Sequence, residues 1–119
     1  MLLESLESLP ITIINLTPHP VNLLDVDANV VITFHTEGLA RCSQNDVIIG
    51  KLNKDIILTK TSYGEVIGLP DEQSPRTFYI VSRLVLNACA GKRHDLLVPN
   101  QLIRDSEGQI VGCRSFSIQ

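Results

Sequence analysis

Short runs of apolar residues, separated by polar or proline-containing segments, predict a chain built mainly from strands. The runs at 11–16, 21–24 and 30–34 are rich in β-branched side chains, which fit an extended backbone. The polar segment 25–29 between the second and third runs predicts a hairpin. Two prolines within 17–20 end the first run, because each removes a backbone donor and fixes φ.

The middle of the chain repeats this pattern with longer polar connections. Runs at 47–49 and 55–60 predict two strands that are joined across residues 50–54. Residues 63–70 continue in extended form and contain two glycines, which mark turns or bulges. The polar segment 71–76 predicts a loop that leads into the next apolar run.

The pattern changes between Thr77 and Gly91, where a strand is followed directly by a helix. Residues 78–81 are apolar throughout, as in a buried strand. Ser82 occupies the N-cap position of a helix that we predict over about 82–91, two to three turns long. Gly91 supplies the left-handed residue that ends it. The free N–H groups at the start of such a helix favour an anion.

The last part of the chain predicts a strand, a break and a hairpin. Residues 96–98 form a buried apolar run, and residues 99–100 begin with a proline that predicts its end. The runs at 101–104 and 109–115 predict the two strands of the hairpin. Gly108 fits the positive-φ position of a type I turn with a G1 bulge.

Together these elements predict an α+β fold, with a mostly antiparallel sheet of short strands and one helix that follows a central strand. The leucine-rich residues 2–9 allow one amphipathic turn before a proline. We therefore expect an N-terminal extension over 1–10 and a single domain over 11–119. At 119 residues the chain is small enough that oligomerisation would help its stability.

The composition is that of a folded chain without a membrane span. Hydrophobic residues make up 44% and charged residues 19%, which argues against disorder. No apolar run approaches the roughly 20 residues of a membrane helix. Residues 1–10 carry two glutamates and no base, so they are not expected to be a signal peptide.

Three widely spaced cysteines, Cys42, Cys89 and Cys113, do not fit a disulfide framework or a zinc site. A disulfide-rich domain uses an even number of cysteines, and a zinc site uses close pairs. We therefore predict reduced thiols, at least two of them buried, in a cytoplasmic protein.

Charge is unevenly distributed along the chain. The net charge of −3 argues against nonspecific binding of genomic nucleic acid, which needs a basic surface. Residues 1–74 have a balance of −6, whereas residues 75–119 have a balance of +3. Five of the six bases in the second part are arginine, which suits forked contacts to phosphate. A solvated surface with a chance imbalance of acidic and basic residues would give the same two charge balances.

Motifs for catalysis or metal binding are missing from the sequence. No GxSxG elbow accompanies a serine or cysteine nucleophile. His19, His35 and His94 are isolated from one another, so they give no metal-ligand spacing. Neither a GxxxxGK[ST] loop nor a GxGxxG fingerprint occurs. We predict no catalytic residue, no metal and no cofactor.

A set of residues suited to binding a phosphorylated nucleotide remains. Arg83 and Asn87 share one face of the predicted helix. Phe78 and Tyr79 point to opposite faces of their strand, so only one of them can stack on a base in a pocket. The candidate ligand-binding residues are Phe78, Tyr79, Arg83, Asn87, Arg104 and Arg114.

A structural interpretation of the same residues is open. Phe78 would then belong to the core, and the arginines would form ion pairs at the surface. The sequence offers Asp95 as a partner for Arg93, and Glu107 as a partner for Arg104. For any single residue this is the simpler interpretation.

Five sequence blocks resemble a family of small phage and prophage proteins. They follow one another in order over nearly the whole chain after residue 10. The blocks are Asn15-Leu16-Thr17-Pro18-His19-Pro20-Val21, Tyr63-Gly64-Glu65-Val66-Ile67-Gly68-Leu69-Pro70, Tyr79-Ile80-Val81-Ser82, Arg93-His94-Asp95-Leu96-Leu97-Val98-Pro99, and Ile103-Arg104-Asp105 through Gly108-Gln109-Ile110-Val111-Gly112. The set is similar to the phage anti-Thoeris proteins, which act as sponges for a signalling nucleotide.

This resemblance implies a function without catalysis. Such a protein would sequester a cyclic ADP-ribose isomer in the cytoplasm of a host bacterium. Related sponges also take up cyclic oligonucleotides. It would form a homo-oligomer, a dimer or a trimer of dimers, with pockets at subunit interfaces. By position, the resemblance carries an aromatic ring, an amide and an arginine of such pockets onto Phe78, Asn87 and Arg104. Arg83 and Arg104 would contact the pyrophosphate.

Two other functions fit the sequence. A phage structural or assembly component would also be a homo-oligomer of short strands. A nucleotide-cleaving enzyme would use the same binding groups but turn the ligand over.

Overall fold

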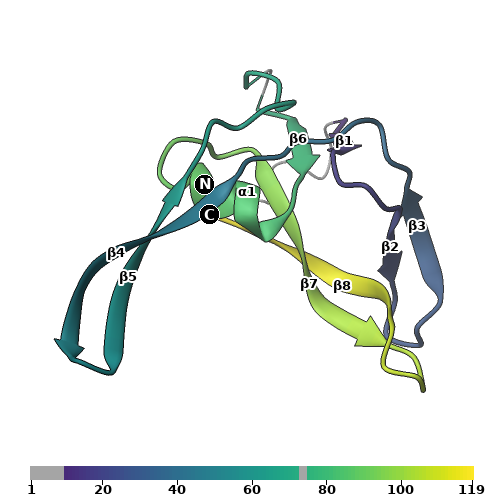
Figure 1. The fold of residues 1–119 in the computed structure, drawn as a ribbon. Coiled ribbons are helices and arrows are strands. Elements are labelled where there is room, and N and C mark those ends of the chain that lie inside the picture. The colour runs from purple at the N-terminus through teal and green to yellow at the C-terminus, as the bar shows by residue number, and fades with distance from the viewer. Residues whose placement is uncertain (1–9, 73–74) are drawn as a thin grey trace.

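The computed structural model describes residues 10–72 and 75–119, which form a mostly-β protein with one short helix (Figure 1). The predicted N-terminal extension, apart from Pro10, and residues 73–74 of the predicted loop lie outside the described residues. The elements in chain order are β1 (Thr12–Asn15), β2 (Val21–Leu24), β3 (Val30–Phe34), β4 (Gln44–Asn53), β5 (Ile56–Tyr63), β6 (Thr77–Ile80), α1 (Arg83–Ala88), β7 (Leu96–Arg104) and β8 (Ile110–Ile118).

The main sheet has six strands in the order β1-β6-β7-β8-β2-β3. Three of its neighbouring pairs, β1–β6, β6–β7 and β2–β8, are parallel, and the pairs β7–β8 and β2–β3 are antiparallel. The predicted mostly antiparallel arrangement is therefore wrong for this sheet, which is mixed and largely parallel. The reason is that strands distant in sequence pair across crossover connections, and local apolar patterns do not encode their direction.

A strand–helix–strand unit, β6-α1-β7, stands at the centre of the sheet. The prediction of Ser82 as N-cap is confirmed, because the amide of Val85 donates to Ser82 Oγ over 3.2 Å. The helix is shorter than predicted and ends at Ala88, and the backbone N–H of its C-cap, Cys89, bonds back into the last turn. Gly91 has the expected positive φ of 78° but lies in the turn beyond the helix.

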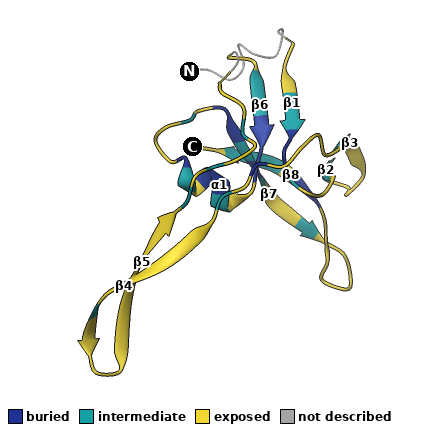
Figure 2. Ribbon diagram, turned by 45° about the horizontal axis from the view of Figure 1, so that its top comes forward, coloured by how far each residue is buried: buried dark blue, intermediate teal, exposed yellow. Residues whose placement is uncertain are grey.

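The core lies between this unit and the loops that cross it. Tyr79, Val81 and Val85 are almost fully buried, and Leu96 packs with them from β7. Leu16 and Ala40 join the cluster from the connections after β1 and before β4. Figure 2 shows the buried residues concentrated where β6, α1 and β7 meet. Of the predicted apolar run 78–81, Tyr79 and Val81 belong to this cluster, Ile80 is buried outside it, and Phe78 is half-buried.

Both short hairpins of the main sheet form as predicted, and each is closed by the same kind of turn. Asp105 Oδ1 accepts from the amides of Glu107 and Gln109, and Gly108 adopts a φ of 81°. In the β2–β3 turn, Asp25 plays the corresponding part, and Ala28 takes the positive φ of 63°. Glycine is the residue best suited to that conformation.

The predicted break at Pro99 does not occur, since β7 continues through it to Arg104. The amide of Val81 donates to the carbonyl of Leu97, so alternate residues of β7 direct their backbone groups toward β6. The nitrogen of Pro99 therefore points toward the β6 side of the strand. β6 ends at Ile80, so no β6 residue lies opposite Pro99. A proline costs no ladder hydrogen bond at such an edge.

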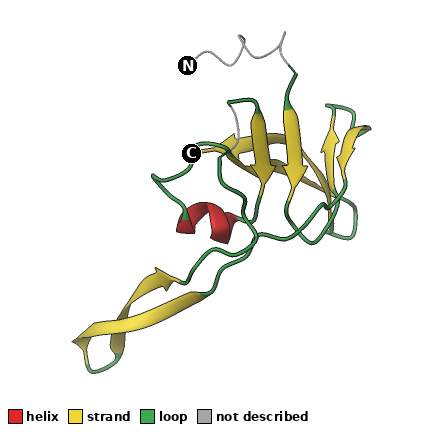
Figure 3. Ribbon diagram, turned by 90° about the horizontal axis from the view of Figure 1, so that it is seen from above, coloured by secondary structure: helices red, strands yellow, loops and turns green. Residues whose placement is uncertain are grey.

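The remaining strands, β4 and β5, pair only with each other and form a long hairpin that we call the arm (Figure 3). The arm is longer than the predicted strands 47–49 and 55–60, and it projects away from the main sheet. All its residues are exposed except Gly50, which is half-buried. Within the described residues, no helix has the length and apolar character needed to cross a membrane.

Candidate functional site

A cavity of about 450 Å³ opens between the β1–β2 loop, the β6–α1 junction and the β7–β8 hairpin. This volume is within the range of small-molecule pockets, roughly 300–1,000 Å³. Its lining residues are Thr17, His19, Pro20, Val21, Asn22, Val81, Ser82, Arg83, Val98, Pro99, Leu102, Ile110, Val111, Gly112 and Cys113. The junction that the sequence singled out therefore forms one wall of the cavity.

Asn15, at the end of β1, holds the loop that forms a second wall. Its side chain is fully buried, and its amide donates to the carbonyls of His19 and Phe34 over 2.9 and 2.8 Å. Its Oδ1 accepts from the backbone N–H of Thr17 over 2.9 Å and from the Thr17 hydroxyl over 2.7 Å. One buried amide thus satisfies four groups and fixes the path of residues 17–20.

Gly112 lets β2 approach β8 closely at the base of the cavity. A Cβ at this position would lie 2.8 Å from the carbonyl oxygen of Asn22 and 2.7 Å from Cγ of Leu24. Such a contact with backbone would force the strands apart. β2 and β8 pair through the single bridge of Leu23 with Cys113. The pairing of these two strands therefore depends on the small size of Gly112, which lies next to that bridge.

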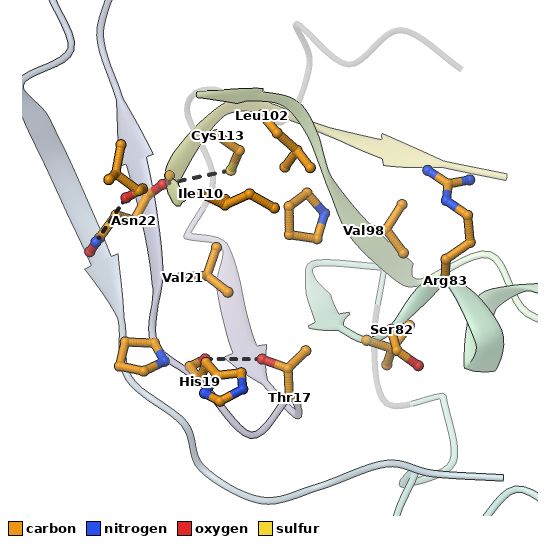
Figure 4. A pocket seen from close by; sticks show the side chains of 15 residues that line it. Thr17, His19, Val21, Asn22, Ser82, Arg83, Val98, Leu102, Ile110 and Cys113 are labelled. Atoms are coloured by element: carbon orange, nitrogen blue, oxygen red, sulfur yellow. Dashed lines mark hydrogen bonds between the residues drawn. The ribbon is translucent and has the colours of Figure 1, made fainter. Parts of the chain in front are cut away.

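The middle of the cavity is aliphatic. In Figure 4, Val21 and Ile110 face Val98 across the opening, and Leu102 covers the far end. Neither Phe nor Tyr contributes to the lining, so a flat ligand would be held between aliphatic side chains rather than stacked on a ring.

The polar groups of the cavity lie around its rim. Asn22 is engaged by other parts of the chain, since its amide donates to Val111 O and its Oδ1 accepts from Thr33. Arg83 is exposed, and its guanidinium forms none of the ion pairs found within the described part of the chain. His19 is also exposed, and Ser82 keeps its hydroxyl proton for an outside acceptor. The rim therefore offers donors suited to an anionic group.

Of the six predicted ligand-binding residues, only Arg83 lines this cavity. Tyr79 is 2% exposed and belongs to the core, whereas Phe78 is half-buried on the opposite face of β6. Asn87 is exposed on α1 but is not part of the cavity wall.

Arg104 and Arg114 lie on opposite strands of the β7–β8 hairpin, as predicted, and both are exposed. Arg104 donates to the carbonyl of Gly108 over 2.8 Å, and Arg114 donates to the carbonyl of Val26 over 3.1 Å. Arg104 is not part of the lining, but it lies two residues beyond Leu102 and pairs with Ile110, and both of these residues line the cavity. Arg104 therefore lies beside the Leu102 end of the cavity, whereas Arg83 lies at the β6–α1 junction.

The arginine nearest to the core forms the ion pair that the structural interpretation predicts. Arg93 donates to both oxygens of Asp95 over 2.9 and 2.8 Å, and Asp95 is 5% exposed. The hydrogen bonds to this carboxylate raise the pKa of Arg93 above its ordinary value. The bond of Arg104 to Gly108, in contrast, is not the predicted contact with Glu107.

The thiols Cys89 and Cys113 are buried, as predicted for at least two of the three cysteines. Burial raises the pKa of both above the ordinary thiol value, because a thiolate loses hydration in the core. Both thiols therefore stay protonated and unreactive near neutral pH. Residues 10–72 and 75–119 contain no group of three His, Cys, Asp or Glu side chains that could hold a metal ion.

The sequence reasoning missed the residues that shape the cavity, above all Asn15 and Gly112. An asparagine that ends a run of β-branched residues just before Thr17-Pro18 was a usable signal, because amide side chains often organise turns. A lone glycine within a strand run was a second signal, since it marks a close approach of backbone.

Comparison with known proteins adds nothing to this geometry, because no protein-family model, no curated protein and no solved structure matches the chain.

Proposed function

We propose that this protein is a phage anti-defence sponge, which binds a cyclic ADP-ribose-type nucleotide and holds it intact. By removing that signal in the cytoplasm of the infected bacterium, it would block Thoeris-type immunity. The family resemblance described above suggests the ligand. The observation that carries the binding function is an aliphatic cavity whose rim bears Arg83 free of any ion pair within the described residues.

The chemistry of the cavity supports a ligand with two unlike parts. A nucleobase would fit the aliphatic middle between Val21, Val98 and Ile110. A phosphate group at the rim would accept charge-assisted hydrogen bonds from Arg83, which are about twice as strong as neutral ones. His19 and Ser82 stand on the same rim and supply further donors.

Sequestration requires tight binding, and one open cavity is a modest basis for it. Nanomolar affinity corresponds to about −12 kcal/mol, which calls for an enclosed ligand with several charged contacts. In the proposed homo-oligomer a second copy would close the opening. Arg104, whose guanidinium donates to the Gly108 carbonyl in its own chain, would act there from the partner chain.

Calorimetry with a cyclic ADP-ribose isomer tests the proposal. We expect exothermic binding, and intact nucleotide in the supernatant after the protein is denatured. Arg83→Ala and Arg104→Ala should each weaken binding at least tenfold, or about 1.4 kcal/mol. Arg41→Ala is the matched control, because Arg41 is an exposed arginine outside the cavity.

Absence of heat with every isomer would contradict the sponge. A cleaved nucleotide would instead identify an enzyme that uses the same cavity. Unchanged affinity in Arg83→Ala would remove Arg83 from the site while leaving the ligand in place.

A second function, a phage structural or assembly component, is favoured by the arm. Its exposed aliphatic side chains suit a protein that is built into a larger particle. Mass spectrometry of purified virions separates the two functions. A structural component co-purifies with the particles in fixed stoichiometry, whereas a sponge is absent from them.

A further inference from the structure

The β4–β5 arm exposes aliphatic side chains on both of its faces. Val47 and Leu58 lie on one face, and Ile48 and Ile57 lie on the other, as the pairing of Val47 with Lys60 and Ile48 with Thr59 requires. The exposed aliphatic residues of the arm are 38% to 68% accessible; they are Val47, Ile48, Ile49, Leu52, Ile56, Ile57 and Leu58. Strands that are apolar on both faces are typical of buried sheets.

Within residues 10–72 and 75–119, the rest of the chain does not support the arm along most of its length. β4 and β5 pair with no strand of the main sheet, and Figures 1 and 3 show the hairpin extending away from it. A two-stranded hairpin in water is marginally stable by itself. The length of this arm therefore calls for a partner surface.

The outer strand of the main sheet offers a surface of matching character. β3 is an edge strand, and Val30, Val31 and Ile32 on it are 57%, 58% and 45% exposed. Figure 1 places β3 and the arm on opposite sides of the molecule, so one chain does not cover its own β3 with its own arm. A second copy can do so.

Charge is complementary between the same two regions. The arm carries Lys51, Lys54 and Lys60 against two aspartates, whereas the described residues 10–43 and 64–72 contain six acids and one base. Two of those acids, Asp25 and Asp27, lie in the turn that leads into β3. An aliphatic surface flanked by lysines on the arm thus matches an aliphatic edge flanked by aspartates.

The area available is that of a weak or transient dimer. Full burial of an aliphatic side chain corresponds to about 60–120 Å², given 1.5–3 kcal/mol per side chain and 25 cal/mol per Å². The seven exposed aliphatic side chains of one arm then present about 230–460 Å² of apolar surface, and about half of it lies on each face. With one face of each arm covered, two reciprocal arms and the surfaces that receive them come to about 460–920 Å², the size of a weak or transient interface.

From these observations we infer that the arm of one copy packs against β3 and the β2–β3 turn of a second copy, in a reciprocal homodimer. The contact covers the aliphatic edge of β3 and places the arm lysines beside Asp25 and Asp27. This inference shares the homo-oligomer with the proposed function but needs no ligand, so crosslinking without nucleotide tests the arm contact, and nucleotide calorimetry tests the sponge.

Carbodiimide crosslinking of the full chain tests this contact directly. Equal amounts of unlabelled and ¹⁵N-labelled protein are mixed, unfolded and refolded together, and then crosslinked between amines and carboxylates. We expect crosslinked peptides that join Lys51, Lys54 or Lys60 to Asp25 or Asp27, with mixed isotope pairs among them. Arm crosslinks confined to single chains, or a monomeric protein, would overturn the inference.

Sedimentation of two matched variants provides a second, independent test. Ile56→Asp changes an arm residue that is 46% exposed, and Ile11→Asp changes a residue of 45% exposure outside both regions. We expect Ile56→Asp to raise the dimer dissociation constant at least tenfold, and Ile11→Asp to leave it unchanged. Equal dimer dissociation constants for the two variants would contradict the proposal that the arm forms the dimer contact.

Discussion

The run at 78–81 and the run at 47–49 look alike in the sequence, but they end in opposite surroundings. Ile80 is fully buried in β6 near the centre of the main sheet, whereas Ile48 is 64% exposed on the arm. Both runs form strands, because local apolar and β-branched character favours extended backbone in either place. The comparison teaches that an apolar run predicts a strand but does not identify the surface that covers it.

The largest contrast is expected from one substitution made in both regions. Leu96→Ala removes a side chain that is 1% exposed, and it should lower the free energy of unfolding by about 2–5 kcal/mol. Leu52→Ala removes one that is 68% exposed, and it should change the stability of the monomer by less than about 0.5 kcal/mol.

Urea unfolding at several protein concentrations measures both effects. If the arm packs on a second copy, the loss caused by Leu52→Ala grows as the concentration rises, because dimerisation contributes to stability by mass action. Equal losses in the two variants at high dilution would contradict the contrast between sheet and arm.

A polar residue gives the next contrast. Asn15→Ala leaves four hydrogen-bond partners without their side-chain partner, and we expect a loss of about 3 kcal/mol. Asn45→Ala on the arm is the matched control, since the side chain of Asn45 is exposed. Thermal unfolding followed by circular dichroism provides the comparison. A loss below about 1 kcal/mol for Asn15→Ala would show that the β1–β2 loop does not depend on this amide.

Alkaline pH should weaken the main-sheet region through its buried thiols. Above about pH 8.5 the cysteines of the unfolded chain release protons that Cys89 and Cys113 retain, because burial raises their pKa. The folded state then binds more protons, so its stability falls as pH rises, by up to about 1.4 kcal/mol per pH unit for each thiol. The double variant Cys89→Ala, Cys113→Ala should flatten this dependence in urea unfolding between pH 8 and 10. An unchanged slope would assign the alkaline loss to other groups.

The smallest effect is expected at the helix N-cap. Ser82→Ala removes the acceptor of the Val85 amide and should cost about 1 kcal/mol, whereas Ser82→Gly should cost only a few tenths. Ser106→Ala in the exposed β7–β8 turn is a suitable control. If Ser82→Ala is as stable as the wild-type protein in urea unfolding, the hydroxyl contributes nothing to the cap.

Local chemistry allowed part of the fold to be predicted. The Ser82 cap, the positive φ of Gly108 and the hairpin of β2 with β3 each depend on neighbouring residues, and the structure confirms all three. The parallel pairing of β1 with β6 was not predictable in this way, because the whole arm lies between these strands in sequence. The continuation of β7 through Pro99 likewise depends on where β6 ends.

The candidate site was predictable to a smaller extent. Arg83 was identified because it follows a capped turn, and it does lie at the cavity. The opposite wall comes from the β1–β2 loop and from Gly112, which only the tertiary pairing of β2 with β8 brings to the same place. A site formed by strands that are distant in sequence cannot be identified from local sequence patterns.

Native mass spectrometry of the protein with a cyclic ADP-ribose isomer tests the central claim of binding without cleavage most directly. One spectrum gives the oligomeric state and the mass of the retained nucleotide. We expect a homo-oligomer that carries the intact nucleotide and releases it unchanged on activation. A spectrum of free protein at saturating nucleotide, or a retained species heavier by one water, would contradict the proposed sponge.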